Sequence, residues 1–316
     1  MRGDVAENRM IDILLSTYNG EEFLREQIDS ILAQTEREWR LLIRDDGSED
    51  STLKIIETYT SEYPGKIVLS DDDISDPLGP CQSFHQLMRM SSAPYVMFCD
   101  QDDVWMPDKI EKMLNVLMNL EKRNGEKTPI LVHSDLQVVD SHLELIYSSF
   151  FKCNHLNPDT FHLPQLTFRN SVTGCACICN RALIDISLPL PSEAIMHDWW
   201  IAMTATLLGK VFCMSEPLVK YRQHSKNVLG VATWSGRITK NFRFKKYKNK
   251  LNDISRQTKA FYKAFQRSVI SDRQNEFLSG VASFYTASYF QKRIIILKYA
   301  IQGNSMIKTL IMLVFA

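Results

Sequence analysis

Three carboxylates in four positions form the part of this sequence best suited to chemistry. They are Asp100, Asp102 and Asp103 in "MFCDQDDVWMP" (97–107), directly behind an apolar run. In an extended segment residues two apart point the same way and lie about 6.6 Å apart, so Asp100 and Asp102 can converge on one object. A divalent cation would turn their repulsion into attraction, and oxygen ligands suit Mg²⁺ or Mn²⁺ shared with a substrate phosphate. The alternative is that Asp102 or Asp103 caps a helix beginning near Pro107.

A second group of carboxylates follows another apolar run, in "RDDGSEDST" (44–52). A carboxylate at this place can accept the imide N–H of a uracil or thymine ring, a donor that adenine lacks. The alternative is a tight Asp-Gly-Ser turn followed by a helix cap from Asp50 or Ser51. The sequence contains neither the glycine pattern of dinucleotide-binding folds nor that of the P-loop, so neither of those sites is supported.

Strand-like and helix-like segments alternate over the first 120 residues. Apolar positions recur at helical spacing in 24–32 and again in 110–120, after Pro107. This alternation predicts an α/β fold with a mostly parallel sheet and helices on both faces. Ligands bind beyond the carboxyl ends of the strands in such sheets, where the polar clusters of this chain fall. The expected strands are 11–16, 39–44, 66–70 and 94–99.

The pattern loosens after residue 129. The segment 147–164 is rich in aromatic residues and is expected to be irregular. "CACIC" (175–179) has cysteines at every second position, which places all three on one strand face and favours core packing over a zinc site. The other expected elements are a strand in 130–140, a strand passing into a helix in 172–184, a helix in 197–210, and a strand with a loop in 216–225.

Charge is divided unevenly in a chain whose net charge is zero. From Val231 onward there are sixteen Lys and Arg against three acids, which leaves 21 against 34 in residues 1–230. The basic part is expected to face an anionic partner, either nucleic acid or anionic lipid. "RITKNFRFKKYKNK" (237–250) mixes cations with aromatics, and the apolar end 305–316 is too short to span a membrane.

The cysteines and the amino terminus indicate a cytoplasmic protein. Seven cysteines, an odd number, sit mainly inside apolar runs, as expected for free thiols in a reducing compartment. "MRGDVAENRM" (1–10) has no apolar core and does not look like a signal peptide. No run reaches the roughly 18 apolar residues of a membrane-spanning helix.

Seven motifs in order resemble the family 2 glycosyltransferases, and most closely the bacterial rhamnosyltransferase branch that acts in surface polysaccharide synthesis. The resemblance covers about residues 10–230. It implies a GT-A domain in 1–230, with a nucleotide-binding half at about 10–128 and an acceptor half at about 129–230, followed by a basic helical region in 231–316. The motifs are "ILLSTYNGEEFLREQIDSILAQT", "LLIRDDGSEDST", "FCDQDDVWMPDK", "HSDLQVVD", "SVTGCACICNRAL", "HDWWIAM" and "YRQHSKNVLG".

The resemblance implies a site for the donor nucleotide and its metal. Asp100 and Asp102 would be the Asp-X-Asp motif that holds Mn²⁺ or Mg²⁺, with Asp100 also contacting the ribose, and His224 would complete the metal shell. Arg222 would assist at the diphosphate. For Tyr18 core packing is the alternative, and for Asn19 with Gly20 the alternative is a simple turn and helix cap. The remaining nucleotide contacts implied are Ser16, Thr17, Tyr18, Asn19, and Asp45 or Asp46 reading the pyrimidine.

The resemblance also implies a base and an acceptor cleft. His197 and Asp198 stand where the family carries an acidic pair, and Asp198 would take the proton of the acceptor hydroxyl. The alternative for Asp198 is a helix N-cap. Gly174 would let backbone approach the sugar, and Trp199 would stack on acceptor rings unless it belongs to the core. Asp135 would line the cleft unless it has a buried hydrogen-bonding role.

The resemblance implies an inverting, metal-dependent transfer of L-rhamnose from dTDP-L-rhamnose to a glycan or lipid-linked acceptor. A UDP-hexose donor is the alternative within the same fold. The enzyme is expected on the inner face of the cytoplasmic membrane, bound peripherally to its anionic surface. The competing class is a nucleic-acid-binding protein that acts through the basic region. Because the glycosyltransferase interpretation is favoured, no nucleic acid partner is expected.

Overall fold

The computed structural model describes residues 9–71, 77–156, 162–224, 240–268, 270–284 and 286–298. The strands are β1 (Ile11–Thr17), β2 (Trp39–Asp45), β3 (Ile67–Leu69), β4 (Tyr95–Cys99), β5 (Val104–Trp105), β6 (Ile130–Val139), β7 (Leu145–Tyr147), β8 (Cys177–Asn180) and β9 (Lys210–Arg222). The helices are α1 (Leu24–Leu32), α2 (Thr52–Glu62), α3 (Pro80–Met90), α4 (Lys109–Asn124), α5 (Phe150–Cys153), α6 (Leu163–Phe168), α7 (Arg181–Ser187), α8 (His197–Leu208), α9 (Lys240–Phe265), α10 (Asp272–Ala282) and α11 (Tyr289–Lys298), with a 3₁₀ turn η1 at Gly174–Ala176.

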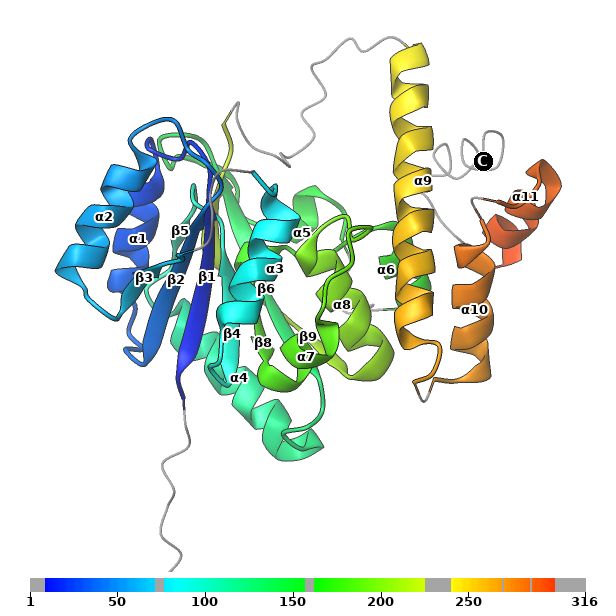
Figure 1. The fold of residues 1–316 in the computed structure, drawn as a ribbon, viewed down its shortest axis with the longest axis horizontal. Helices are drawn as coiled ribbons and strands as arrows, with labels where there is room; N and C mark the ends of the chain where they lie inside the picture. The colour runs from blue at the N-terminus through cyan, green and yellow to red at the C-terminus, as the bar shows by residue number, and fades with distance from the viewer. Residues whose placement is uncertain are drawn as a thin grey trace, which may run out of the picture.

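These strands form one sheet in the order β3-β2-β1-β4-β8-β6-β9-β5, with β7 paired to β6. β3, β2, β1 and β4 run parallel, and β6 runs parallel to β9. β8 is antiparallel to both β4 and β6, while β5 is antiparallel to β9. Figure 1 shows the sheet between two layers of helices. The prediction of an α/β fold with a mostly parallel sheet and helices on both faces is confirmed.

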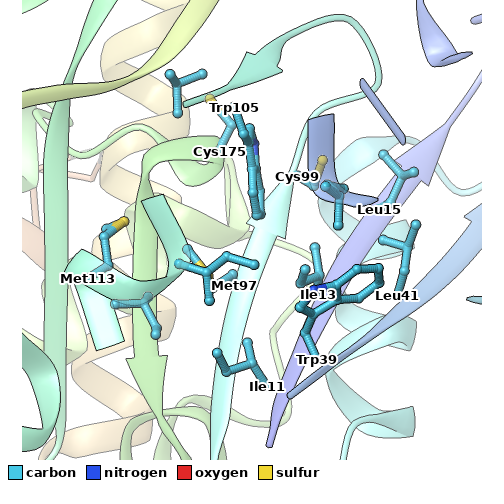
Figure 2. Packing of buried hydrophobic residues seen from close by; sticks show 14 of the residues in the cluster. Ile11, Ile13, Leu15, Trp39, Leu41, Met97, Cys99, Trp105, Met113 and Cys175 are labelled. Carbon is cyan, nitrogen blue, oxygen red and sulfur yellow. The ribbon is translucent and has the colours of Figure 1, made fainter. Parts of the chain in front are cut away.

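One face of the sheet packs against α1, α2 and α4. Alternate residues of each strand point to this face, so Ile13 and Leu15 of β1 join Ile28 of α1 and Ile110 of α4 in one core cluster. Figure 2 shows part of this cluster, with Ile13 beside Trp39 of β2. Full burial of each such side chain contributes roughly 1.5–3 kcal/mol of hydrophobic stabilisation.

The opposite face packs against α3, α6, α7 and α8, and it extends into the C-terminal helices. Leu14 and Phe98 face this side. Trp200 of α8 meets Phe261 of α9 edge to face, with ring centroids 5.1 Å apart, and Phe277 of α10 belongs to the same cluster. Figure 1 shows α9 beyond α8 and α6, with α10 against it. The described part of the basic C-terminal region therefore shares a core with the sheet.

The cysteine prediction was wrong for one residue. Cys177 and Cys179 lie on β8 and pack on the side of α8, but Cys175 belongs to the cluster on the other face. The 3₁₀ turn η1 precedes the strand and breaks the two-residue alternation there. All three thiols are buried, as core packing requires.

Two other expectations need comment. The segment 147–164, expected to be irregular, contains α5 and the start of α6, while residues 157–161 lie outside the described part. The expected strands and helices of 11–120 are found, and the helix in 197–210 is α8, followed by Gly209. The boundary expected near residue 230 and the apolar end 305–316 also lie outside the described residues.

Candidate active site

The carboxyl ends of β1, β2 and β4 bring the predicted nucleotide residues to one edge of the sheet. Thr17 and Asp45 are register partners on β1 and β2, and the Thr17 hydroxyl donates a hydrogen bond of 2.8 Å to Asp45. Asp45 also accepts hydrogen bonds from the backbone N–H groups of Gly47 and Ser48, at 3.1 and 2.7 Å. Both carboxylate oxygens of Asp45 therefore close the turn that the sequence left as an alternative to base recognition.

Asp46 is held in a different way. Its carboxylate pairs with Arg44 at 2.5 Å and accepts hydrogen bonds from the backbone N–H groups of Leu78 and Gly79, at 2.9 and 2.8 Å. Asp46 thus joins the end of β2 to the start of α3. Recognition of a pyrimidine by Asp45 or Asp46 stays a prediction. The predicted cap by Asp50 or Ser51 is wrong for Ser51, which occupies the N-cap position of α2 but makes no side-chain capping bond.

The loop after β1 is fastened to the loop after β4 by Gln101, a residue that the sequence did not single out. Its side-chain oxygen accepts from the Tyr18 N–H at 2.9 Å, and its amide nitrogen donates to the Tyr18 carbonyl at 3.0 Å. A Cβ at Gly20 would lie 2.3 Å from the Gln101 side chain, so a larger residue there would displace Gln101 from Tyr18. The Tyr18 side chain is 52% exposed, so its alternative as a core residue is wrong.

Ser16 and Asn19 complete this edge. The Ser16 hydroxyl donates to that of Ser83 on α3, at 2.8 Å. Asn19 has a positive φ of 47° and accepts a hydrogen bond of 2.8 Å from the Glu49 N–H with its side chain. It does not cap α1, whose N-cap position is Phe23. The contacts of Ser16, Thr17, Tyr18 and Asn19 with a nucleotide stay predictions.

The three carboxylates behind β4 divide into two groups. Asp102 lies beside His224, with 2.8 Å between its Oδ2 and the ring Nε2. Asp100 lies with Asp103 and Cys175, and one ligand atom of each falls within 4.8 Å of the others. Helix capping by Asp102 or Asp103 is wrong, because α4 begins after Asp108. The sequence brought Asp102 and His224 into one site but gave no signal that Cys175 would join Asp100.

We call Asp100, Asp102 and Asp103 the carboxylate corner. Burial and like charge make its ionised form unfavourable in free energy unless a cation is bound. Desolvation, followed by the charges of Asp102 and Asp198, raises the pKa of Asp100 to about 7. Burial and the neighbouring carboxylates also raise the pKa of Asp103 well above its usual value. Burial keeps Cys175 a neutral thiol by raising its pKa. The oxygen atoms and the His224 imidazole are therefore the donors that suit Mn²⁺ or Mg²⁺.

Two buried cations support the corner from behind. Arg222 donates from its side chain to the carbonyls of Asp102 and Ser141, at 2.8 and 2.7 Å, and pairs with the carboxylate of Glu26. Lys109 is fully buried and donates to the carbonyl of Cys175 at 2.5 Å. Its sequence position, in an amphipathic helix, gave no signal of this role. A contact between Arg222 and a diphosphate stays a prediction.

Asp198 lies in the first turn of α8 with one oxygen held and the other without a partner. Its Oδ2 accepts the Gly174 N–H at 2.9 Å. Its Oδ1 has no partner at hydrogen-bonding geometry among the described residues, although the Asn170 side chain and the Trp199 N–H lie close enough to the carboxylate to lower its pKa. Burial raises the pKa of Asp198 to about 6, although the Gly174 N–H works in the opposite direction. The N-cap alternative is wrong, because Met196 occupies that position.

The residues expected to line an acceptor cleft are buried in contacts with the protein itself. His197 packs between the rings of Phe84 and Phe98. Trp199 donates from its indole nitrogen to the Leu166 carbonyl at 2.6 Å, which is the core placement left open by the sequence.

Asp135 is likewise buried. It accepts hydrogen bonds from the Ser149 hydroxyl at 2.5 Å and the Phe151 N–H at 3.0 Å, so it has the hydrogen-bonding role that was its alternative. Acceptor contacts by Asp135, Gly174, His197 and Trp199 stay predictions.

The comparisons with known proteins agree with a glycosyltransferase of GT-A fold. Residues 12–125 match the model of glycosyl transferase family 2, so the chain carries a domain of that family. The dTDP-rhamnosyl transferase RfbG of Shigella flexneri is 26% identical over 229 residues, covering 68% of this chain and 73% of RfbG.

Solved structures show the same fold. S. aureus TarS superposes with a TM-score of 0.55 at 16% identity, over 86% of this chain but only 42% of that longer chain. The structure of TarS 1–349 in complex with UDP-GlcNAc superposes with a TM-score of 0.53 at 14% identity, over 91% of this chain and 79% of that chain. The mannosyltransferase PcManGT of Pyrobaculum calidifontis, solved in complex with GDP-Man and Mn²⁺, superposes with a TM-score of 0.50 at 13% identity, over 95% of this chain and 77% of that chain. At these identities the likeness shows the fold alone.

Proposed function

We propose that this glycosyltransferase moves a sugar from a nucleotide-sugar donor to an acceptor hydroxyl in one inverting, metal-dependent step. The observation that carries the proposal is the state of Asp198, whose Oδ2 is anchored by the Gly174 N–H while Oδ1 has no partner among the described residues. A general base needs a fixed orientation and a lone pair left for the proton. A pKa of about 6 makes Asp198 a better proton acceptor than an ordinary carboxylate while leaving it ionised at neutral pH.

The proton transfer follows from this arrangement. The acceptor oxygen attacks the anomeric carbon from the face opposite the nucleotide, its proton passes to Oδ1 of Asp198, and the C–O bond to the nucleoside diphosphate breaks. The anomeric configuration is therefore inverted in a single displacement. The charge of Asp198 raises the pKa of Asp100, so the two carboxylates are close enough to interact electrostatically.

A divalent cation fits the donor set of the corner. Asp102 with His224 would hold it, together with Asp100, which is close enough to Asp102 for the charge of Asp102 to raise its pKa. Asp103, grouped with Asp100, adds a further carboxylate. When bound, the cation supplies charge that stabilises the departing diphosphate. The protein residues by themselves hold three acidic groups together at a cost in electrostatic free energy, which such a cation removes.

For the donor we propose dTDP-L-rhamnose, and for the acceptor a glycan or lipid-linked sugar in bacterial surface polysaccharide synthesis. The support is the likeness to RfbG, whose name gives dTDP-rhamnosyl transfer. A UDP-hexose is the second candidate, because the TarS structure that shares this fold was solved with UDP-GlcNAc. Both nucleotides present the same imide edge to Asp45 or Asp46.

We further propose that the enzyme works in the cytoplasm, bound peripherally to the anionic inner face of the membrane. The support is α11, where Phe290, Ile294 and Leu297 are exposed at helical spacing beside Arg293 and Lys298. Each near-surface cation contributes about 1 kcal/mol to binding an anionic bilayer. Among the described residues no helix has the length and apolarity to cross a membrane.

A vesicle flotation assay tests the membrane proposal. Binding to anionic vesicles that weakens with salt, and that Phe290→Asp reduces, is the expected result. The same protein tested with labelled single-stranded oligonucleotide distinguishes the competing class, because a steep salt slope there with no vesicle binding would favour nucleic acid as the partner.

The experiment that tests the function is a transfer assay over a panel of nucleotide sugars with Mn²⁺. We expect nucleoside diphosphate release above background with dTDP-L-rhamnose, and product of inverted configuration by NMR. Release from none of the donors with any of the glycan acceptors, despite a folded protein, would contradict the proposed activity.

A further inference from the structure

Gly174 lies so close to His197 that a side chain at position 174 would collide with the imidazole ring. A Cβ built on Gly174 would lie 2.9 Å from Nε2 of His197 and 3.4 Å from the Cβ of Asp198. Real Cβ atoms essentially never come within 3.0 Å of another heavy atom. The φ of Gly174 is not in the left-handed region, so a side chain is disfavoured here by the close contact and not by backbone strain.

The imidazole of His197 is packed against two aromatic rings. Its ring centroid lies 4.0 Å from that of Phe84 and 4.7 Å from that of Phe98, and the residue is 2% exposed. Neither ring nitrogen has a hydrogen-bond partner among the described residues. Burial lowers the pKa of His197 to about 3, so the ring is neutral. It is held by packing and not by polar contacts.

The backbone at Gly174 is fixed from the other side. The carbonyl of Cys175, the next residue, accepts a hydrogen bond of 2.5 Å from Lys109, whose ammonium lies 3.2 Å from the centroid of the Trp105 ring. The Gly174 carbonyl accepts a weaker bond from the Cys177 thiol, at 3.2 Å. Figure 2 shows Cys175 beside Trp105. The turn η1 is thus pinned between a buried lysine and the His197 ring.

We propose that Gly174 and His197 are a packed pair that positions Asp198, with the ring pressing η1 into the place from which the Gly174 N–H holds Oδ2. Both are positioning residues, and His197 acts by its volume and not by either nitrogen. This inference rests on the proposed role of Asp198 as the base.

The test is a set of variants assayed for kcat, donor KM and nucleoside diphosphate binding. Gly174→Ala should lower kcat by about 100-fold, the scale of a displacement of about 1 Å at a reacting group, with donor KM and nucleotide affinity within twofold. The double variant Gly174→Ala with His197→Ala should have a kcat at least tenfold higher than Gly174→Ala alone, because it lacks the atom that the new methyl group meets. Adding His133→Ala, another buried histidine, should restore none of the lost kcat.

A second variant covers the case in which Gly174→Ala does not fold. His197→Leu keeps a side chain of similar volume without nitrogen atoms, and it should keep kcat and acceptor KM within about threefold. His197→Ala alone should lower kcat more than His197→Leu does. Thermal unfolding of each variant shows whether a loss of kcat accompanies loss of the fold.

The results separate this inference from the proposed function. If His197→Leu raises acceptor KM or abolishes transfer, His197 contacts the acceptor and the positioning role is wrong. Equal restoration by His133→Ala and His197→Ala, or full kcat in Gly174→Ala, would also overturn it. If Asp198→Asn keeps its activity, the base assignment fails, whatever the Gly174 variants show.

Discussion

Asp198 is the residue on which the transfer chemistry depends most. Asp198→Asn keeps the shape of the side chain and its bond from Gly174 but removes the basic oxygen. We expect kcat to fall by about 10²–10⁴-fold, the usual contribution of a general base, with nucleoside diphosphate affinity within twofold. Turnover is measured by diphosphate release and affinity by calorimetry. Turnover in the variant within a few-fold of wild type would end the base assignment.

The pH dependence of kcat gives an independent test at the same residue. Asp198 must be ionised to accept the proton, and burial has raised its pKa to about 6. With saturating Mn²⁺, which would hold Asp100 ionised although burial raises its pKa to about 7 in the protein alone, the rate should be constant above pH 6. Below that pH it should fall tenfold per unit, as the Asp198 carboxylate becomes protonated. His197 does not contribute to this limb, since its pKa is about 3. A profile that stays level down to pH 5 would show that the base is an ordinary exposed carboxylate or a different group.

At the residue scale, the structure brings together side chains that no local pattern in the sequence could join. Asp102 and His224 are 122 residues apart, and only the family resemblance joined them, yet their side chains meet. Gln101, Lys109 and Cys175 were missed because their roles come from tertiary contacts. Nothing in the spacing of α4 indicates that Lys109 is buried, and η1 could not be anticipated from the alternation in "CACIC".

At the scale of secondary-structure elements, Asp12 joins three elements at the amino ends of the strands. It lies on β1, pairs with Arg40 of β2, and accepts hydrogen bonds from the Ser91 hydroxyl and the Ala93 N–H after α3. We expect Asp12→Ala to lower the free energy of unfolding by about 3 kcal/mol, because buried donors lose their acceptor. Asp185→Ala, which removes an exposed partner of Arg181, is the control and should cost less than about 1 kcal/mol.

The pH dependence of that stability has a definite sign. Burial acts to raise the pKa of Asp12, but the hydrogen bonds from Arg40 and Ser91 outweigh it, so the folded-state pKa lies below its usual value of 3.8. The stabilisation is therefore present above about pH 4 and is lost as pH falls through the lower folded-state pKa. Urea unfolding at pH 7 and pH 3 should show the difference between wild type and Asp12→Ala shrinking at the lower pH. An unchanged difference would contradict the ion pair as its source.

Elements with a strong period were predictable, and short elements were not. β1, β2 and β4 follow from apolar runs, and α1 and α4 from apolar positions at helical spacing. α5 and α6 have four and six residues, too few for a period to be visible, and they form because Phe151 and Leu166 find buried sites. The tertiary contacts decide these elements, so the sequence of 147–164 looked irregular.

At the scale of the whole molecule, the C-terminal helices are expected to unfold together with the sheet. Phe261 of α9 is fully buried against Trp200 of α8. Phe261→Ala should lower the free energy of unfolding by about 3–5 kcal/mol, with one transition in calorimetry. Phe290→Ala, at a site 75% exposed, should change it by less than about 0.5 kcal/mol. Two separate transitions, with only the minor one affected by Phe261→Ala, would show that the helices form an independent unit.

The charge division along the chain was visible in the sequence, but the way the two parts meet was not. The excess of cations after Val231 led to the prediction of a separate basic region. Within it Ile254, Phe261 and Phe277 are apolar residues that complete the core beside α8. Single aromatic residues among lysines carry no signal of which surface they will cover, so this packing required the structure.

The central claim is that the carboxylate corner binds a nucleotide sugar together with a divalent cation, and calorimetric titration tests it most directly. dTDP-L-rhamnose and a UDP-hexose are titrated into the wild-type protein and Asp102→Ala, each with Mn²⁺ and with EDTA. We expect binding of the preferred donor to wild type with Mn²⁺, and at least tenfold weaker binding with EDTA or in Asp102→Ala. Equal affinity in all four conditions, or binding of neither donor, would contradict the account.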